Sequence, residues 1–260
     1  MKESPDPQYF KQLNQMLQNR DRAIPSMIVD LDILDENIET LKRNMQPGVT
    51  FRVVVKSLPS SGMIDYIRER SGSDKLMVFH QPFLTDIAKG SNSDTDILMG
   101  KPMPVKTARY FYDSIQDRSN DFDPSQQISW LMDTKERLIQ YLDLSKSINQ
   151  KIKVNLEVNV GLHRGGFEDL KDLKEALDLI ELNPEFLELS GLMGYDPHVA
   201  KIPPIIRSRK KALQLSNTFY NKCKSLIKSD YPSLWKKDLV FNGAGSPTVG
   251  LHQDSDSPLN

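Results

Sequence analysis

Cysteine is almost missing from this sequence. Of its 260 residues only Cys223 is a cysteine, so the chain cannot form an intrachain disulfide or build a zinc site from cysteines. Such sparse use of cysteine is typical of a reducing compartment. We therefore expect a cytoplasmic protein.

Long hydrophobic runs are also missing. The first twenty residues, MKESPDPQYFKQLNQMLQNR, are polar and charged where a secretory signal peptide needs an apolar run. No later stretch has the roughly 20 consecutive apolar residues that span a bilayer as a helix. The sequence therefore predicts neither export by that route nor a membrane anchor.

An excess of charge of either sign is the third absence. The chain has 34 Lys and Arg residues against 35 Asp and Glu residues, which gives a formal net charge of -1. A protein that binds a polyanion usually carries a marked basic excess. The composition therefore argues against a nucleic-acid partner, while the length is ample for a buried core.

The pattern changes near residue 22. Before it, the sequence is rich in Gln, and its apolar residues recur at helical spacing as Tyr9, Phe10, Leu13 and Leu17. We therefore expect a peripheral N-terminal helix over residues 1–22 and a separate domain over residues 23–260. That domain opens with the run Ile24–Val29, which we expect to be a short strand, and Asp30–Asp32 then predict the start of a helix.

From Thr50 onward, short apolar or β-branched runs alternate with segments of helical period, the pattern of βα units around a parallel sheet. The runs are Phe51–Val55, Leu76–Phe79, Ile97–Met99, Ile128–Met132, Ile152–Val160, Leu187–Met193 and Leu239–Phe241. Helical stretches between them include Ile64–Arg70, Val105–Ile115, Lys135–Ile148, Asp169–Leu182 and Arg207–Ile227. This spacing favours an α/β fold, a TIM-type (β/α) barrel, over an open Rossmann sheet. The polar tail Gly250–Asn260 shows no eighth strand, so we expect a barrel one strand short of closure.

In such a barrel the reactive groups lie where strands end, so the polar residues that close each run are the candidates. Lys56 follows the Val-rich run and is expected at the mouth of the barrel. A lysine that loses its water there becomes a nucleophilic amine. The alternative is a lysine that extends into solvent from a strand end.

Two further runs end in polar and aromatic residues. The glycine turn that follows Val160 presents His163 and Arg164, and a guanidinium is a permanent forked donor for an anion or a phenolate oxygen. The run ending at Gly194 is followed by Tyr195, which could pack against a ring or relay a proton, and by His198, a potential acid or base near neutral pH. The alternatives are that His163 and Arg164 are solvated side chains on an ordinary glycine turn, that Tyr195 is structural and that His198 lies on the surface.

The last run is followed by the small-residue segment Gly243-Ala244-Gly245-Ser246-Pro247-Thr248, called the 243–248 loop below. Small residues directly after a strand free backbone N–H groups to face a phosphate, and Ser246 and Thr248 add hydroxyl donors. No lysine follows, so this is not a Walker motif, and the spacing of the dinucleotide fingerprint is absent. An isolated tight turn is the alternative.

A lysine on an early strand, an arginine on a middle strand and a phosphate-binding loop late in the barrel are together the parts that hold pyridoxal phosphate. The sequence resembles the pyridoxal-phosphate enzymes of the alanine racemase-like barrel type (fold type III), in particular the D-threonine aldolase and D-serine dehydratase branch. The resemblance covers most of the chain. It is carried by Ile24–Asp32 with Asn37, Arg52, Lys56-Ser57, Gly161–Gly165, Gly191–Tyr195 and Gly243–Thr248.

The resemblance implies that Lys56 forms a Schiff base with pyridoxal 5'-phosphate and later acts as a base. It further implies that Arg164 bonds the phenolic oxygen of the cofactor and that Tyr195 lies near the cofactor ring. Tyr195 and His198 join Lys56 as catalytic candidates. The residues assigned to the phosphate are Gly243, Gly245, Ser246 and Thr248.

Two departures from the family pattern limit this transfer. The histidine that approaches the lysine in the family is replaced by Val53-Val54-Val55, so its role is absent or falls to His80. The family also continues into an eighth strand and a C-terminal β domain, which supplies a second catalytic group or the ligands of a divalent metal. The present sequence ends at Asn260 and resembles the barrel part. We therefore assign no metal ligand in this chain and expect a divalent metal only together with that domain.

Three hypotheses remain open on the sequence. The first is a pyridoxal-phosphate-dependent lyase or racemase that acts on a small D-amino or β-hydroxy amino acid by racemisation, retro-aldol cleavage or dehydration. The second is a barrel protein that binds pyridoxal phosphate and influences its homeostasis but catalyses no reaction. The third is an incomplete barrel whose unpaired strand edges recruit another chain. The resemblance also implies a homodimer.

Overall fold

The computed structural model describes residues 6–21, 24–57, 60–117, 119–203, 205, 208–253 and 257–259. They form two compact units, one up to Asn37 and one from Ile38 onward. The predicted division at residues 22 and 23 lies outside the described residues. The predicted N-terminal helix is confirmed as α1 (Pro7–Gln18), which begins where the Asp6 side chain accepts a hydrogen bond from the Gln8 amide.

Asp30 organises the rest of the first unit. Its Oδ1 accepts a hydrogen bond from the Ile33 amide at 3.1 Å and so caps α2 (Leu31–Arg43), while its Oδ2 accepts from the Tyr9 hydroxyl at 2.8 Å. The bond from the Ile33 amide and then that from Tyr9 lower the pKa of Asp30. The helix expected after Asp30 is therefore confirmed.

The strand expected over Ile24–Val29 is wrong, since this segment forms neither strand nor helix. No strand among the described residues supplies hydrogen bonds to it, and Pro25 lacks an N–H to donate.

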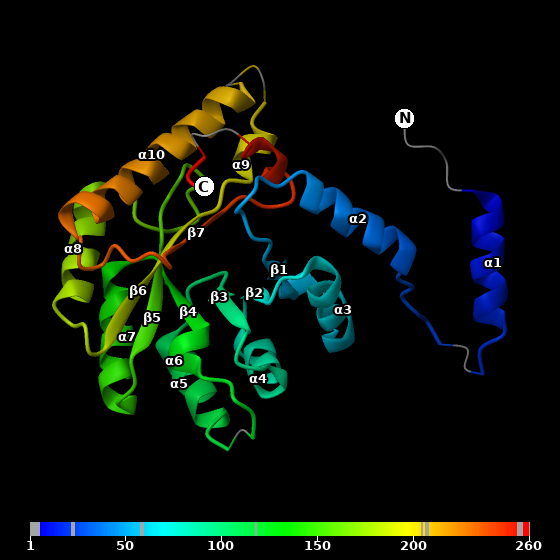
Figure 1. Cartoon of the computed structure of the whole chain (residues 1–260), viewed down its shortest axis with the longest axis horizontal. Coiled ribbons are helices and arrows are strands. Elements are labelled where there is room, and N and C mark those ends of the chain that lie inside the picture. Colours follow the sequence, from blue (N-terminus) through cyan, green and yellow to red (C-terminus); the bar gives the residue numbers. More distant parts are fainter. Residues whose placement is uncertain are drawn as a thin grey trace. The chain divides into compact units, whose positions relative to one another are not determined.

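The second unit is built on a seven-stranded sheet in which each strand is parallel to the next one along the chain. All seven predicted runs contribute a strand. Among the described residues β1 and β7 are not paired with each other, so the sheet is an open half-barrel rather than a closed one (Figure 1). This confirms the expected fold class. The strands are β1 (Val53–Val54), β2 (Lys75–Val78), β3 (Asp96–Met99), β4 (Ile128–Met132), β5 (Ile152–Glu157), β6 (Leu187–Gly194) and β7 (Val240–Gly243).

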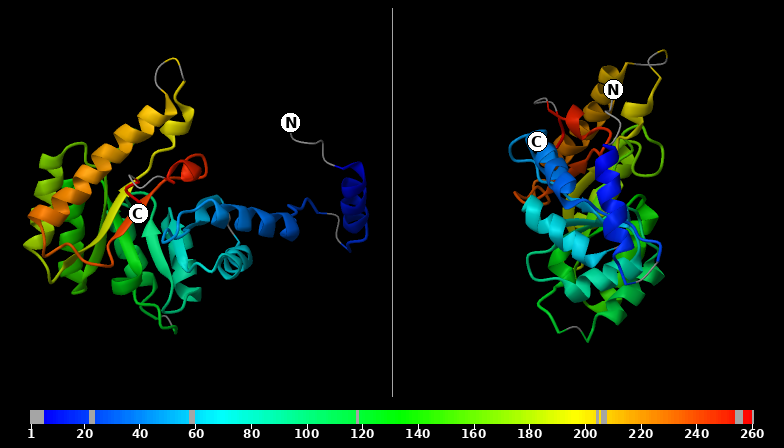
Figure 2. Two further views of the ribbon diagram at one scale, coloured as in Figure 1. Left: turned by 45° about the horizontal axis from the view of Figure 1, so that its top comes forward. Right: turned by 90° about the vertical axis from the view of Figure 1, so that its right-hand side faces the viewer.

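Helices follow the strands and lie outside the curved sheet (Figure 2). Several begin at a residue whose side chain accepts from a backbone amide in the first turn, as Ser60, Thr134 and Asp169 do. The start predicted at Arg207 lies outside the described residues. The helices are α3 (Ser61–Ser71), α4 (Gln81–Gly90), α5 (Val105–Ser114), α6 (Pro124–Gln127), α7 (Lys135–Ile148), α8 (Leu170–Glu181), α9 (His198–Lys201) and α10 (Arg209–Asp230), with short 3-10 turns η1 (Val55–Ser57) and η2 (Val249–Leu251). No helix in the described part of the chain is long and apolar enough to cross a membrane.

The core lies between the sheet and these helices. Its largest side chain, Trp130, is fully buried, contacts three other aromatic rings and donates a hydrogen bond from Nε1 to the Tyr112 hydroxyl at 3.0 Å. Tyr141 in turn donates to the Met103 carbonyl at 3.0 Å. The polar atoms of these aromatic residues are thus satisfied inside the core, as burial requires.

Charged residues fasten the amino-terminal ends of β1, β2 and β3. Both terminal nitrogens of Arg52 bond the Asp96 carboxylate, at 3.0 and 3.1 Å, and Lys75 bonds the same carboxylate at 2.8 Å. Burial alone would raise the pKa of Asp96, but Arg52 and Lys75 more than offset it and hold the pKa below its ordinary value. Arg52, one of the residues that carry the family resemblance, therefore holds the sheet together at the end opposite Lys56.

A β-bulge lies where β5 pairs with β6. Val154 faces Leu189 while Asn155 faces Gly191, so Ser190 is an extra residue, and its hydroxyl donates to the Val154 carbonyl at 3.1 Å. Gly191 has φ +139°, and a Cβ there would overlap the carbonyl of Val240 on β7. Only glycine allows β7 to pair at this position.

We expect Gly191→Ala to lower the free energy of unfolding by at least about 2 kcal/mol, because the added carbon must push β7 away from β6. Gly62→Ala is the control, since a Cβ there meets no atom within 4 Å and the residue lies in α3. The control should unfold at the wild-type urea concentration or slightly above it. Equal urea midpoints for the two variants, measured by circular dichroism, would contradict this account.

Candidate functional site

Lys56 lies in η1, directly after β1, at the edge of the sheet formed by the carboxyl-terminal ends of the strands, called the carboxyl edge below. Its side chain is exposed, and its Nζ lies 4.4 Å from the centroid of the Phe79 ring. Among the described residues Lys56 forms no ion pair. A cationic amine resting on a ring face at a strand end is accessible to a ligand from solvent.

Phe79 follows β2 and connects Lys56 to the end of β3. Its ring fills the space beside Gly100, where a Cβ would overlap the ring atoms. The Gly100 carbonyl in turn lies 3.4 Å from Nη2 of Arg164, a long hydrogen bond. Lys56 and Arg164 therefore lie on either side of the Phe79–Gly100 contact.

Arg164 is held by Glu157, the last residue of β5. Its Nε donates to Oε1 of Glu157 at 2.8 Å, and the Glu157 side chain is 4% exposed against 24% for Arg164. Burial raises the pKa of Glu157, and nearby Asp133 adds to this, while Arg164 and Lys101 act against it. Among the described residues, Nη1 of Arg164 has no hydrogen-bond partner, so its two N–H groups are available to an anion or phenolate.

Tyr195 connects Arg164 to the 243–248 loop. The Arg164 guanidinium lies 4.8 Å from the centroid of the Tyr195 ring. The same ring contacts Gly245, where a Cβ would lie 2.8 Å from Cε2 of Tyr195. The structure thus connects Lys56, Arg164, Tyr195 and Gly245 along the carboxyl edge, with Phe79 and Gly100 between Lys56 and Arg164.

The remaining loop residues differ sharply in exposure. Ser246 is exposed, and among the described residues it makes no hydrogen bond. Thr248 is fully buried, donates its hydroxyl proton to Oδ1 of Asp196 at 2.8 Å and accepts from the Gly245 amide at 3.1 Å. Gly243 packs against Leu259, where a Cβ would meet Cδ2 at 2.8 Å.

His163 and His198 lie in other surroundings. His163 is exposed in a left-handed conformation, φ +56°, and its ring contacts the Asn159 side chain. His198 begins α9 and packs against Gly161, with Nε2 3.1 Å from a Cβ placed there, and burial is the main cause of its lowered pKa. Among the described residues no hydrogen bond, ion pair or ring contact joins His198 to Lys56 or Arg164.

Asp196 and His252 also belong to the site, although sequence reasoning missed both. Asp196 is 2% exposed, and its Oδ2 lies 2.7 Å from Nε2 of His252, whose Nδ1 lies 3.1 Å from Oγ of Ser257. The sequence signal for Asp196 is its position directly after Tyr195, at the end of a strand. His252 and Ser257 lie in the polar tail Gly250–Asn260, whose sequence contains no comparable signal.

Several side chains have buried polar atoms without a partner among the described residues, and two of these side chains, Asn155 and His198, lie on segments that carry the candidate site. Both side-chain atoms of Asn155 are buried and unpaired, as is Nδ1 of His198. Asn155 is two residues before Glu157 on β5, so both side chains emerge on the same face of the sheet. Buried polar atoms left unpaired are costly and suggest a place for a ligand or water.

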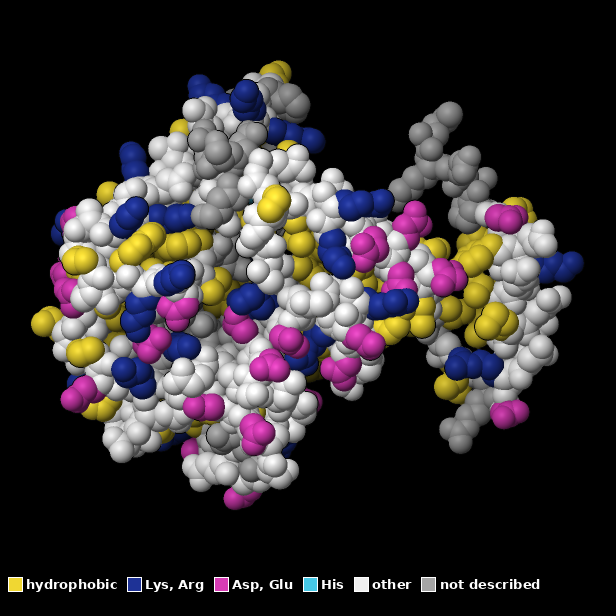
Figure 3. All heavy atoms as spheres, in the orientation of Figure 1, with side chains coloured by type: hydrophobic (Ala, Val, Ile, Leu, Met, Phe, Trp, Pro, Cys, Tyr) yellow, Lys and Arg dark blue, Asp and Glu magenta, His cyan; other side chains and the backbone are white. Residues whose placement is uncertain are grey.

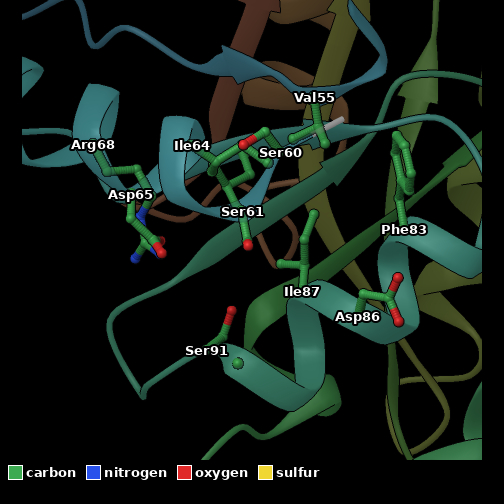
Figure 4. Close-up of a pocket in the computed structure, with 12 residues that line it drawn as sticks. Val55, Ser60, Ser61, Ile64, Asp65, Arg68, Phe83, Asp86, Ile87 and Ser91 are labelled. Carbon is green, nitrogen blue, oxygen red and sulfur yellow. The ribbon is translucent and has the colours of Figure 1, made fainter. Parts of the chain in front are cut away.

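A separate cavity of about 410 Å³ lies between α3 and α4 (Figure 4). Ile64 of α3 and Phe83 and Ile87 of α4 line it, together with Val55. None of the predicted site residues lines this cavity. No group of three or more His, Cys, Asp or Glu side chains arranged to hold a metal ion occurs in the part of the chain that the structure describes.

Comparison with solved structures finds the same fold in several enzymes. D-threo-3-hydroxyaspartate dehydratase from Delftia sp. HT23 matches with a TM-score of 0.69 and 16% identity, over 88% of this chain and 57% of that one. The alanine racemase from Bacillus anthracis with bound L-Ala-P matches with a TM-score of 0.66 and 17% identity, over 91% and 56%. The alanine racemase from Clostridium difficile 630 matches with 0.66 and 18%, over 88% and 57%.

The chain therefore spans about half the length of these solved structures. At such low identity the likeness concerns the fold. A comparison with curated proteins finds no match. Residues 29–233, most of the chain, match the model of the family described as alanine racemase, N-terminal domain. With its parallel half-barrel, this chain belongs to the alanine racemase N-terminal domain family.

Proposed function

We propose that this chain holds pyridoxal phosphate at the carboxyl edge and acts on a small D-amino or β-hydroxy amino acid. Members of the family bind that cofactor. One observation carries the proposal: a continuous line of contacts runs from Lys56 through Phe79, Gly100, Arg164 and Tyr195 to Gly245. An amine, an arginine and a glycine-rich loop are thus neighbours on one edge of the sheet.

The residues present fit the chemistry of this cofactor. The amine of Lys56 is accessible for a covalent bond to an aldehyde carbon, and Ser246 with the adjacent backbone is free to meet a phosphate. The unpaired Nη1 of Arg164 between them supplies a donor for an oxygen on the ring. The unpartnered Asn155 side chain is buried on the same sheet face as Glu157. When bound, pyridoxal phosphate withdraws electrons from the carbon next to the substrate amine.

The chain's own groups then have separate tasks. Glu157 orients Arg164 by accepting a hydrogen bond from its Nε, and the Tyr195 ring packs against the guanidinium. Once Lys56 is free, its amine can accept a proton from substrate. His198 is kept as a further candidate acid or base because its lowered pKa favours the neutral imidazole, which can accept a proton.

The proposal also specifies which molecules this chain is expected to bind. The substrate is a small amino acid, and a homodimer is expected from the family resemblance. On the face shown in Figure 3, Lys and Arg side chains lie among Asp and Glu side chains, in keeping with the proposal that no nucleic acid is bound. A divalent metal would need ligands from outside the described residues. A variant of the dehydratase from the solved structures is described in a metal-free form, which makes metal addition a necessary arm of the activity test.

The deciding experiment is a turnover assay with D-threonine, D-serine and alanine, each with and without manganese or zinc. Product from any of them supports an enzyme and identifies the reaction as cleavage, dehydration or racemisation. Cofactor binding without turnover would favour the non-catalytic alternative. Absence of cofactor binding would contradict the proposal as a whole.

We expect the purified chain with cofactor to absorb at the edge of the visible range, and borohydride to fix the cofactor on the peptide that contains Lys56. Lys56→Arg keeps a positive charge over Phe79 but cannot form the covalent bond, so it should lose the label while unfolding within about 0.5 kcal/mol of wild type. Lys101→Arg is the matched control and should keep the label. A label on any lysine other than Lys56, found by peptide mass mapping, would refute the assignment.

We expect Arg164→Ala to lower the free energy of unfolding by about 1–3 kcal/mol at neutral pH, because it leaves the Glu157 carboxylate buried without its partner. The raised pKa of Glu157 means that the folded state binds this proton more readily than the unfolded state, so stability falls as pH rises through that pKa. The deficit should therefore shrink at acid pH. Urea unfolding at several pH values checks this.

The control for that series is Glu157→Gln in the Arg164→Ala background. It removes the buried charge, so the double variant should regain stability at neutral pH and lose the extra pH dependence. A deficit that stays constant with pH in both variants would show that Glu157 is not the group responsible.

A further inference from the structure

The hydroxyl of Thr248 both donates and accepts a hydrogen bond inside the protein. It has one proton, and its closest acceptor is Oδ1 of Asp196 at 2.8 Å, while its lone pairs accept the Gly245 amide at 3.1 Å. The residue is 0% exposed. Thr248 therefore has no proton to offer an anion in this arrangement, although the family resemblance assigns it to the phosphate.

Ser246 is in the opposite situation. It is exposed two residues away on the same loop, and among the described residues neither its hydroxyl nor its amide has a partner. The amides of Thr248 and Val249 both donate to the Gly245 carbonyl, at 2.9 and 2.8 Å, which closes the turn around Ser246. The 243–248 loop therefore has a hydrogen-bonded part, formed by Gly245 and Thr248, and an exposed part at Ser246.

Asp196 is itself held from two sides. Its second oxygen bonds Nε2 of His252 at 2.7 Å, and the other ring nitrogen of His252 faces Ser257 at 3.1 Å. All three side chains are buried. Because both carboxylate oxygens are used and the imidazole is fixed in turn, the acceptor for Thr248 has little freedom to move.

The segment Ser257–Leu259 packs back on the same loop. Lys224 of α10 donates to the Pro258 carbonyl at 2.6 Å, and Leu259 fills the space beside Gly243. Figures 1 and 2 show this red segment beside the end of β7. Thr248, His252 and Ser257 thus connect the loop to residues that follow it in the sequence.

We infer that Asp196, supported by His252, is a positioning residue that fixes Thr248 and through it the Gly245 amide, so that Ser246 and its neighbouring backbone meet the phosphate. This inference rests on the proposed function and specifies its phosphate site. Thr248 holds the loop, and Ser246 contacts the anion.

The first test measures binding of inorganic phosphate, pyridoxal phosphate and pyridoxal to the full-length apoprotein by calorimetry. Ser246→Ala and Thr248→Val should each weaken phosphate binding by about tenfold, the first by removing a donor and the second by releasing the loop. Thr248→Ser keeps the hydroxyl and should bind phosphate within about twofold of wild type. All three should bind pyridoxal, which lacks the phosphate, as wild type does.

The second test separates positioning from direct contact. Hydrogen exchange at the Gly245 amide should be slow in wild-type apoprotein and in Thr248→Ser, fast in Thr248→Val and Asp196→Ala, and no faster when phosphate saturates the wild type. In phosphate affinity, Thr248→Val and Asp196→Ala should combine to no more than the larger single loss, because both release the same loop. Ser246→Ala should cost less in either of those backgrounds than in the wild-type chain, because the Ser246 contact depends on the held loop. Should Asp196→Ala fail to fold, Asp196→Asn keeps an acceptor for Thr248 and is expected to retain slow Gly245 exchange.

The outcomes distinguish this inference from the proposed function. A wild-type chain that binds neither pyridoxal phosphate nor phosphate overturns both. A wild-type chain that binds both ligands, while Thr248→Val binds phosphate equally well or leaves Gly245 exchange unchanged, overturns the inference alone. The inference is also overturned if Thr248→Val weakens the binding of pyridoxal as much as the binding of pyridoxal phosphate, because the variant would then have damaged the fold in general.

Discussion

The guanidinium of Arg164 is the group on which the carboxyl edge depends. It bonds Glu157 at the end of β5, approaches the Gly100 carbonyl after β3 and lies on the Tyr195 ring after β6. These contacts use different parts of one planar cation: its Nε, its Nη2 and its face. Because the partner carboxylate is buried, the guanidinium is also fixed by the need to neutralise that charge. Three strand ends are thereby held in one arrangement around a donor that is still free.

Two glycines are as important to the carboxyl edge as the side chains around them. Gly100 leaves space for the Phe79 ring, and Gly245 leaves space for the Tyr195 ring. A Cβ at either position would displace the ring that carries Lys56 or Arg164 on its face. The two glycines therefore let aromatic rings lie between charged groups and strand ends. Charge pairs at the other end of the sheet, around Asp96, hold the amino-terminal ends of β1, β2 and β3.

Much of this arrangement was predictable from sequence because it depends on local patterns. Seven apolar runs became seven strands in the expected order, since short apolar runs that alternate with segments of helical period are typical of parallel βα units. Strand order then places Lys56, Arg164, Tyr195 and the 243–248 loop on one edge, because parallel strands all end on the same side. Ile24–Val29 shows the limit: an apolar run becomes a strand only where a neighbour supplies hydrogen bonds.

The sequence by itself thus determined the parallel strands and which residue types follow each of them, because both are properties of short segments. Only the tertiary structure decided how those residues are used. It buried the Thr248 hydroxyl against Asp196, brought His252 back to the same carboxylate from 56 residues away, and left Ser246 exposed. Such hydrogen bonds join residues distant along the chain, so their partners are fixed by packing, and no pattern within one segment contains them.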